Sequence, residues 1–136
     1  MDKQKKLDLM KKAACIRKHI IEEVFSAKSG HPGGSLSCTD IFTVLYFDEM
    51  RVDVNNPKWA DRDRFVLSKG HCAPALYATL ALKGFFPEKD LVTLRKVDSY
   101  LEGHPSMTYV PGVDMSTGSL GQGISAAAGM AMAAKL

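Results

Sequence analysis

Three of the four histidines in this chain directly follow a glycine: Gly30-His31, Gly70-His71 and Gly103-His104. Glycine has no Cβ, so it bends the chain where other residues clash and lets a ligand approach the backbone. His31 and His104 each precede a proline, which fixes the next φ angle and stiffens the loop. Imidazoles on stiff, open loops can transfer protons near neutral pH. The pattern indicates three chemically active loops, although three unrelated turn histidines would share the same spacing.

Length and composition are those of one globular domain, which we expect to span residues 1–136. Five lysines among the first twelve residues supply much of the +3 net charge, and we interpret them as a solvated helix face rather than a nucleic-acid site. Three cysteines without C-x-x-C spacing favour neither a disulfide framework nor a zinc knuckle. With no signal peptide and no membrane-spanning run, we expect a cytoplasmic chain.

The first predicted element is a long amphipathic helix over residues 4–28. Its apolar side chains cluster on one half of a helical wheel, at about 100° per residue, and its charged side chains occupy the other half. His19 falls in the middle of the charged half, so we expect it to be exposed and without a role.

A glycine-rich loop is predicted next, over residues 31–35. Ser37 and Asp40 have the spacing of a capping box, which predicts the start of a second helix. The following residues are apolar almost all round, so we expect this helix to be buried. A helix whose positive end faces a glycine-rich loop favours an anionic ligand.

The middle of the chain predicts a strand followed by a helix. Residues 65–67 are a short apolar run of β type, and a helix is expected over residues 72–83, with Pro74 in its first turn and Gly84 as its C-terminal cap. His71 then lies just beyond the carboxyl end of a strand, which is where α/β sheets bind ligands.

The last third of the chain predicts a short surface helix over 87–96 and a long irregular loop over 97–115 that contains His104. A loop of this length usually carries a binding function. A glycine-rich turn then leads into a final helix of small residues, whose close-packing surface indicates a tightly packed helix or a subunit interface.

Two other kinds of site are disfavoured by the pattern. Gly121-x-Gly123-x-x-Ala126 matches the dinucleotide fingerprint as a string, but no apolar strand precedes it and no acidic residue follows at the required distance. His31, His71, His104 and Cys72 contain zinc-ligating atoms, but they lack the short local spacing that zinc sites normally show.

Four motifs, in order and at matching separations, resemble transketolase: Ser29-Gly-His-Pro-Gly33, Asp63-Arg-Phe-Val-Leu-Ser-Lys-Gly-His71, Glu102-Gly-His-Pro105 and Thr117-Gly-Ser-Leu-Gly-Gln-Gly123. The resemblance covers almost the whole chain. It implies an α/β fold, the front half of a parallel-sheet domain that binds thiamine diphosphate, predominantly helical in this part. The Gly-Gly-Ser-Leu-Ser stretch after Pro32 is more similar to the N-terminal subunit of the split, two-subunit form.

The resemblance implies a transferase that moves a two-carbon ketol unit from a ketose phosphate to an aldose phosphate, as in the pentose phosphate pathway. Residues matching His31 and His71 assist proton transfer in the substrate channel, and His71 also approaches the cofactor's diphosphate. The residue matching His104 hydrogen-bonds the two-carbon fragment. Backbone matching Gly118, Ser119 and Leu120 contacts the aminopyrimidine ring.

Two positions depart from the family's usual pattern. Ser119 stands where many members have proline, and Ser106 stands where many have an acidic residue. The first departure is compatible with contacts made by the backbone, whereas the second puts the fine substrate contacts in question.

The resemblance also predicts what this chain does not carry. The family's Mg²⁺ ligands, a Gly-Asp-Gly motif and a downstream Asn, are expected beyond Leu136, so no residue here is expected to bind metal. We interpret residues 1–136 as a truncated front part, inactive by itself. It would need a pyrimidine-binding domain or C-terminal subunit in a homo- or hetero-oligomer. A dihydroxyacetone or deoxyxylulose-phosphate synthase, or a non-catalytic assembly fragment, are the alternatives.

Overall fold

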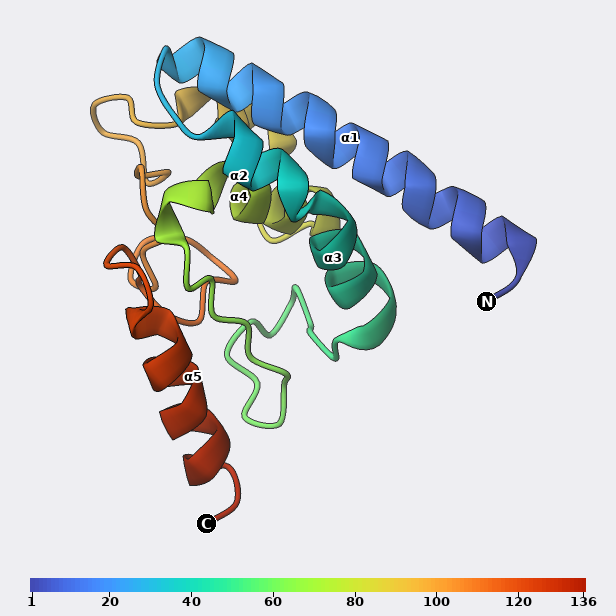
Figure 1. Cartoon of the computed structure of the whole chain (residues 1–136), viewed down its shortest axis with the longest axis vertical. Helices are drawn as coiled ribbons and strands as arrows, with labels where there is room; N and C mark the ends of the chain where they lie inside the picture. Colours follow the sequence, from blue (N-terminus) through green and yellow to red (C-terminus); the bar gives the residue numbers. More distant parts are fainter.

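Helices joined by short helical turns and long irregular segments make up the whole chain in a computed structural model that describes residues 1–136. In chain order they are α1 (Lys3–Ala27), α2 (Pro32–Ser37), α3 (Thr39–Val44), the π-helical turn η1 (Leu45–Glu49), the 3₁₀ turn η2 (Gly70–Cys72), α4 (Ala73–Lys83), the 3₁₀ segment η3 (Glu88–Thr93) and α5 (Gln122–Ala133). No two segments pair as strands (Figure 1).

The predicted amphipathic helix is confirmed as α1. Its buried side chains recur every three or four residues and form one stripe: Leu9, Ala13, Ile16, Ile20 and Glu23. The Asp2 side chain caps the first turn by accepting a hydrogen bond from the Lys5 N–H at 2.7 Å. The chain leaves the helix at Lys28, which adopts the left-handed conformation with a φ of 51°.

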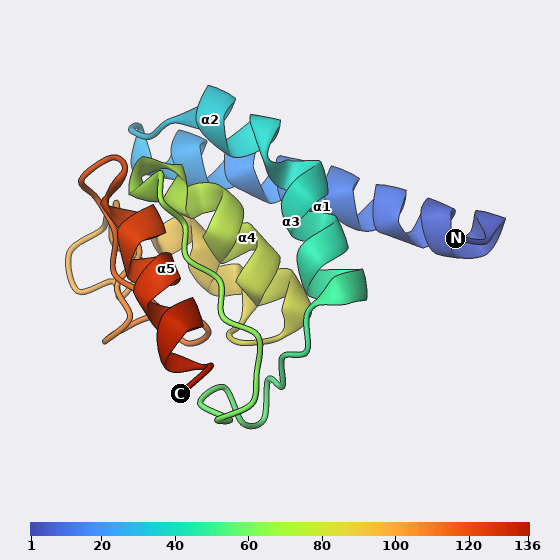
Figure 2. The same ribbon diagram turned by 60° about the horizontal axis from the view of Figure 1, so that its bottom comes forward.

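Helix α4 forms the centre of the hydrophobic core. Every residue from Ala73 to Ala81 is buried, and the helix packs against α1, α2, α3 and η3 (Figure 2). Pro74 lies in the first turn, and Gly84 caps the end with a φ of 104°, both as the sequence predicts. This buried helix contacts α2, η2 and the turn at His104, so it supports all three segments that carry the glycine–histidine motifs.

The predicted loop at residues 31–35 and the predicted capping box are both wrong. The chain is already helical from Pro32, and the next helix begins at Thr39 with no side-chain cap. Ser37 is the last residue of α2 and Cys38 is the N-cap of α3, so the Ser37 hydroxyl donates to the Gly34 carbonyl at 3.0 Å instead of capping α3. The Asp40 carboxylate instead accepts a hydrogen bond from Arg17 at 2.5 Å.

The helix that follows is less buried than its composition predicts. Ile41 and Val44 on α3 are 61% and 40% exposed, while Phe42 and Tyr46 face the core. The short apolar run therefore has an inner side, which packs against α1, α4 and the Phe65 ring, and an outer side that stays exposed.

The predicted strand at residues 65–67 does not form. A strand needs a neighbouring strand for its backbone hydrogen bonds, and side chains take that place here. The Asp114 carboxylate accepts from the Phe65 N–H at 2.9 Å, and the Thr117 hydroxyl donates to the Leu67 carbonyl at 2.7 Å. The segment is thus held by the loop that precedes α5.

The C-terminal third largely follows the prediction. The expected surface helix is the shorter η3, which buries Leu91, and residues 97–115 are irregular. Helix α5 lies at the edge of the molecule (Figure 1), with Gly123 as its one buried residue. No helix has the combined length and apolar character needed to cross a bilayer.

Candidate functional site

His31 and His71 are brought together although 40 positions separate them in the sequence. His31 directly precedes α2, His71 lies in η2, and their ring centroids are 4.9 Å apart at an angle of 70°. Gly34 permits this contact between the two elements. A Cβ at Gly34 would lie 2.6 Å from the Cys72 Sγ and 3.7 Å from the His71 Nε2.

Lys69 links the same two elements. Its Nζ donates to the Gly34 carbonyl at 2.7 Å and approaches the Ser37 hydroxyl at 3.4 Å. From the sequence alone, Lys69 stands out only as part of a motif, and its role as a link was missed. Its position two residues before His71 was the available signal.

His104 lies on the long loop, and a side chain of α4 holds this part of the loop in place. The Tyr77 hydroxyl is 2.9 Å from the Glu102 carbonyl and 3.0 Å from the His104 carbonyl, so one donor holds both ends of this turn. Sequence reasoning missed Tyr77, because a buried tyrosine in an apolar helix carries no functional signal. The exposed His104 ring lies beside Gly118, where an added Cβ would be 3.6 Å from the ring.

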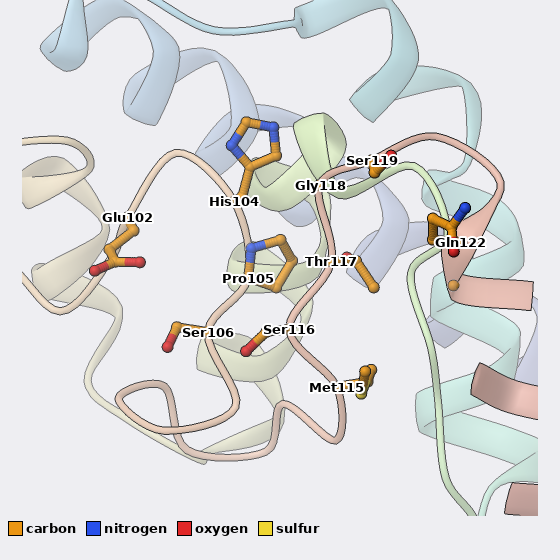
Figure 3. A pocket seen from close by; sticks show the side chains of 11 residues that line it. Glu102, His104, Pro105, Ser106, Met115, Ser116, Thr117, Gly118, Ser119 and Gln122 are labelled. Atoms are coloured by element: carbon orange, nitrogen blue, oxygen red, sulfur yellow. The ribbon is translucent and has the colours of Figure 1, made fainter. Parts of the chain in front are cut away.

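A pocket of about 430 Å³ opens between residues 102–106 and 115–123. Figure 3 shows His104 beside Gly118 and Ser106 beside Ser116 where the two segments run next to each other. The Thr117 N–H donates to the Pro105 carbonyl at 3.3 Å, which ties the segments together. Of the predicted cofactor-contacting residues, Gly118 and Ser119 line this pocket, and Leu120 is 69% exposed next to it.

Two glycines let the loop before α5 come close to the segment that carries His71. A Cβ at Gly70 would lie 2.4 Å from the Thr117 carbonyl oxygen, and one at Gly123 would lie 2.6 Å from the Ser68 Cα. The Ser68 hydroxyl accepts a hydrogen bond from the Ile124 N–H at 3.2 Å, in the first turn of α5. Side chains larger than hydrogen at these two glycines would force the loop away from the site.

A buried ion pair holds the other end of this loop. Arg62 and Asp114 are 11% and 8% exposed at their side chains, and the guanidinium donates to one carboxylate oxygen at 2.5 and 3.1 Å. The second oxygen accepts the Phe65 N–H described above. Asp114 therefore satisfies two donors from the segment that leads to His71.

The pKa of His71 lies below its ordinary value of 6.5. Partial burial is the largest cause, followed by the positive charge that His31, Lys69 and His104 would place nearby. At neutral pH the His71 imidazole is therefore uncharged and free to accept a proton. Geometry places the three histidines in one region, because His31 and His71 are in ring contact, Gly70 packs against Thr117, and the next residue, Gly118, lies beside His104.

The loop at the edge of the pocket has backbone donors that are free to bind a ligand. The backbone N–H groups of Gly118, Ser119 and Leu120 donate to no acceptor within the chain, so they are free to donate to a ligand. The N-terminus of the twelve-residue α5 adds its partial positive charge at the same place. Together these donors suit an anionic ligand.

The alternative zinc site is not formed by the residues first considered for it. His31, His71, His104 and Cys72 do not gather their ligand atoms in one group, whereas Cys15, His19 and Glu88 do. The expectation that His19 is exposed is wrong. Its side chain is 12% exposed and contacts two carboxylates, because η3 covers this part of α1.

Comparison with known proteins agrees with this geometry. Residues 9–136 match the family model described as transketolase, thiamine diphosphate binding domain. The chain belongs to the transketolase family. Transketolase from Leishmania mexicana superimposes with a TM-score of 0.88 at 40% identity, over 92% of this chain and 19% of that one. Transketolase from Campylobacter jejuni also gives 0.88, at 39% identity, over 99% of this chain and 21% of that one.

The similar curated proteins include subunits of split transketolases. The chain is 50% identical over 133 residues to a 6-deoxy-6-sulfo-D-fructose transketolase subunit of a Clostridium species, covering 98% of this chain and 48% of the relative. It is 53% identical over 120 residues to an apulose-4-phosphate transketolase subunit of Phocaeicola vulgatus, covering 88% of this chain and 42% of the relative. This chain thus spans less than half the length of these subunits. The expected front half of an α/β transketolase domain is confirmed, with its helices present and its strand absent.

Proposed function

We propose that this chain is the histidine-bearing part of a transketolase that transfers a two-carbon ketol unit from a ketose phosphate to an aldose phosphate. One observation carries the proposal: histidines from three separate segments come together beside a pocket whose loop has unused backbone donors. Chance turn histidines would have no reason to converge. The family match supports the same assignment.

His31, His71 and His104 are the proposed catalytic residues. His71 is uncharged at neutral pH, because its pKa is lowered by partial burial and by nearby positive charge, so it can take a proton from a sugar hydroxyl. His31 lies within ring contact of it and can hold the neighbouring oxygen. His104, whose ring lies beside Gly118, is proposed to donate a hydrogen bond to the two-carbon fragment.

Thiamine diphosphate supplies, when bound, the carbanion chemistry needed to break and form the carbon–carbon bond. The backbone of Gly118, Ser119 and Leu120 is proposed to hold its aminopyrimidine ring, and His71 to approach its diphosphate. We propose Mg²⁺ as a companion of the diphosphate. None of the residues described here is assigned as its ligand.

The proposed partner is a pyrimidine-binding domain or C-terminal subunit, in a homo- or hetero-oligomer. The similarity to split-transketolase subunits supports this arrangement. Sugar phosphates are the proposed substrate class. The names of the two relatives above specify different sugars, so several sugar phosphates must be tested as substrates.

The test is two-carbon transfer by the complete enzyme that contains this chain, measured by mass spectrometry over a panel of ketose and aldose phosphates. We expect activity that requires thiamine diphosphate. Separate His31→Ala, His71→Ala and His104→Ala variants should each lower kcat/KM by about 10²–10⁴, the usual contribution of a positioned acid–base group.

The matched control is Lys58→Ala, an exposed cation on a loop outside the site. It should keep wild-type kinetics, and circular dichroism should show that all four variants are folded. Near-wild-type kcat/KM in the three histidine variants, or transfer without thiamine diphosphate, would overturn the assignment.

A further inference from the structure

A second cluster of reactive side chains lies outside the pocket, between α1 and η3. Cys15 and His19 are four residues apart on α1, so they occupy the same helix face. Glu88, the first residue of η3, meets them from 69 positions further along the chain. One ligand atom from each of the three lies within 4.8 Å of the others.

His19 is held in a defined orientation by a fourth residue. Its Nδ1 is 3.0 Å from a Glu22 carboxylate oxygen, and its Nε2 is 2.7 Å from Glu88. The ring therefore presents Nε2 toward Glu88 while Glu22 fixes the other nitrogen. A carboxylate on the second ring nitrogen is the usual support of a metal-binding histidine, because it sets both tautomer and orientation.

The donor set selects the metal. A cysteine sulfur, an imidazole nitrogen and a carboxylate oxygen are together typical ligands of Zn²⁺, whereas Mg²⁺ and Ca²⁺ prefer oxygen alone. Tetrahedral zinc bonds place ligand atoms about 3.3–3.6 Å apart. Side chains already within 4.8 Å can reach this spacing by small rotations, with Glu88 moving slightly away from Nε2. Glu88 is exposed, so water can complete the tetrahedron.

We propose that Cys15, His19 and Glu88 form a Zn²⁺ site that clamps η3 onto α1, with Glu22 as a positioning residue. Zinc binding replaces the thiol proton of Cys15 and the proton shared between the His19 Nε2 and Glu88, and both protons pass to solvent. The site is separate from the histidine pocket and does not depend on the proposed function.

The clamp has a clear structural consequence. Without metal, η3 is tied to α1 by the His19–Glu88 contact and by the Ser26 hydroxyl, which donates to the Val92 carbonyl at 2.7 Å. Bound zinc replaces the direct His19–Glu88 contact with a metal-mediated tie that also includes Cys15. The junction leads through Arg95 to the turn that carries His104, where the Arg95 guanidinium lies against Gly103.

The experiment titrates the purified, metal-free protein with Zn²⁺ by calorimetry and with Co²⁺ by absorption spectroscopy. We expect one Zn²⁺ per chain, and a thiolate-to-cobalt charge-transfer band with the strong visible absorption of a tetrahedral ion. Cys15→Ser should abolish the charge-transfer band. His19→Asn and Glu88→Gln should each weaken zinc affinity by more than about 10-fold, and Glu22→Gln by about 10-fold through lost orientation.

The controls separate this site from its alternatives. Glu49→Gln changes an exposed glutamate away from the cluster and should leave affinity unchanged. Zinc should raise the Tm of the wild type but not that of Cys15→Ser, with both proteins folded by circular dichroism. If His19 only bridges two carboxylates as an ion pair, neither metal binds stoichiometrically. Absent binding, or equal binding by Cys15→Ser, overturns the proposal.

Discussion

Glu23 occupies a position where the helical pattern calls for an apolar side chain. It is fully buried on the core stripe of α1, and neither carboxylate oxygen has a hydrogen-bond partner within the protein. Burial therefore raises the pKa of Glu23 well above its ordinary value of 4.5. The folded protein keeps this carboxyl protonated at pH values where the unfolded chain has already released the proton.

This linkage predicts a loss of stability with rising pH. Above about pH 4.5 the folded state binds one more proton than the unfolded state, so the free energy of unfolding falls until the raised pKa is reached. Glu23→Met removes the group and should raise the free energy of unfolding at pH 7 by about 1–3 kcal/mol. Urea unfolding at several pH values measures both effects. A difference between the two proteins that stayed constant from pH 4 to pH 8 would contradict the argument.

At the scale of elements, long segments without secondary structure are held by side chains rather than by backbone ladders. The segment before η2 and the loop before α5 meet through Asp114, which serves Arg62 and the Phe65 N–H at once. Because the pair is almost fully buried, removing one partner leaves a charge and a backbone donor without compensation.

Asp114→Ala is accordingly expected to lower the free energy of unfolding by about 3–5 kcal/mol. The exposed pair of Arg17 and Asp40 provides the comparison, since Asp40→Ala should cost less than about 1 kcal/mol. Chemical denaturation of both variants gives the two values. If both variants lost the same free energy of unfolding, burial of the Arg62–Asp114 pair would not make that pair more important for stability than the exposed one.

Across the whole molecule, α5 is the element with the least internal packing. Ile124 and Met132 are 69% and 71% exposed, and the helix buries only Gly123. Met130 is half-buried beside Arg64 and Val66. The outer face of α5 therefore fits the proposed subunit interface, because its small residues allow another backbone to approach closely.

Gly129 gives a clean test of this interface. A Cβ there meets nothing within 4 Å, so Gly129→Leu leaves the protein's own packing intact. Sedimentation should show self-association, or association with the pyrimidine-binding partner, that the substitution weakens by steric overlap. Ala14→Leu, the same kind of enlargement on an exposed face of α1, should not weaken it. A parent that stays monomeric with and without the partner would refute the interface.

The accuracy of the sequence-based predictions varied with the range of the interactions involved. Helices α1 and α4 were predicted with ends within one or two residues, because apolar spacing and the Gly84 cap are local signals. The capping box failed because Ser37 ends a helix instead of starting one. The predicted roles of the site residues remain predictions.

Local sequence signals are sufficient to predict the long helices, the glycine–histidine motifs and the family, because each depends on residues that are close together in the chain. Three contacts became visible only in the folded chain: His31 with His71, the Tyr77 hydroxyl with the His104 turn, and His19 with Glu88. It also showed the 65–67 segment to be unpaired. These outcomes depend on contacts between residues far apart in the chain, and local propensity contains no information about which distant segment comes to lie alongside.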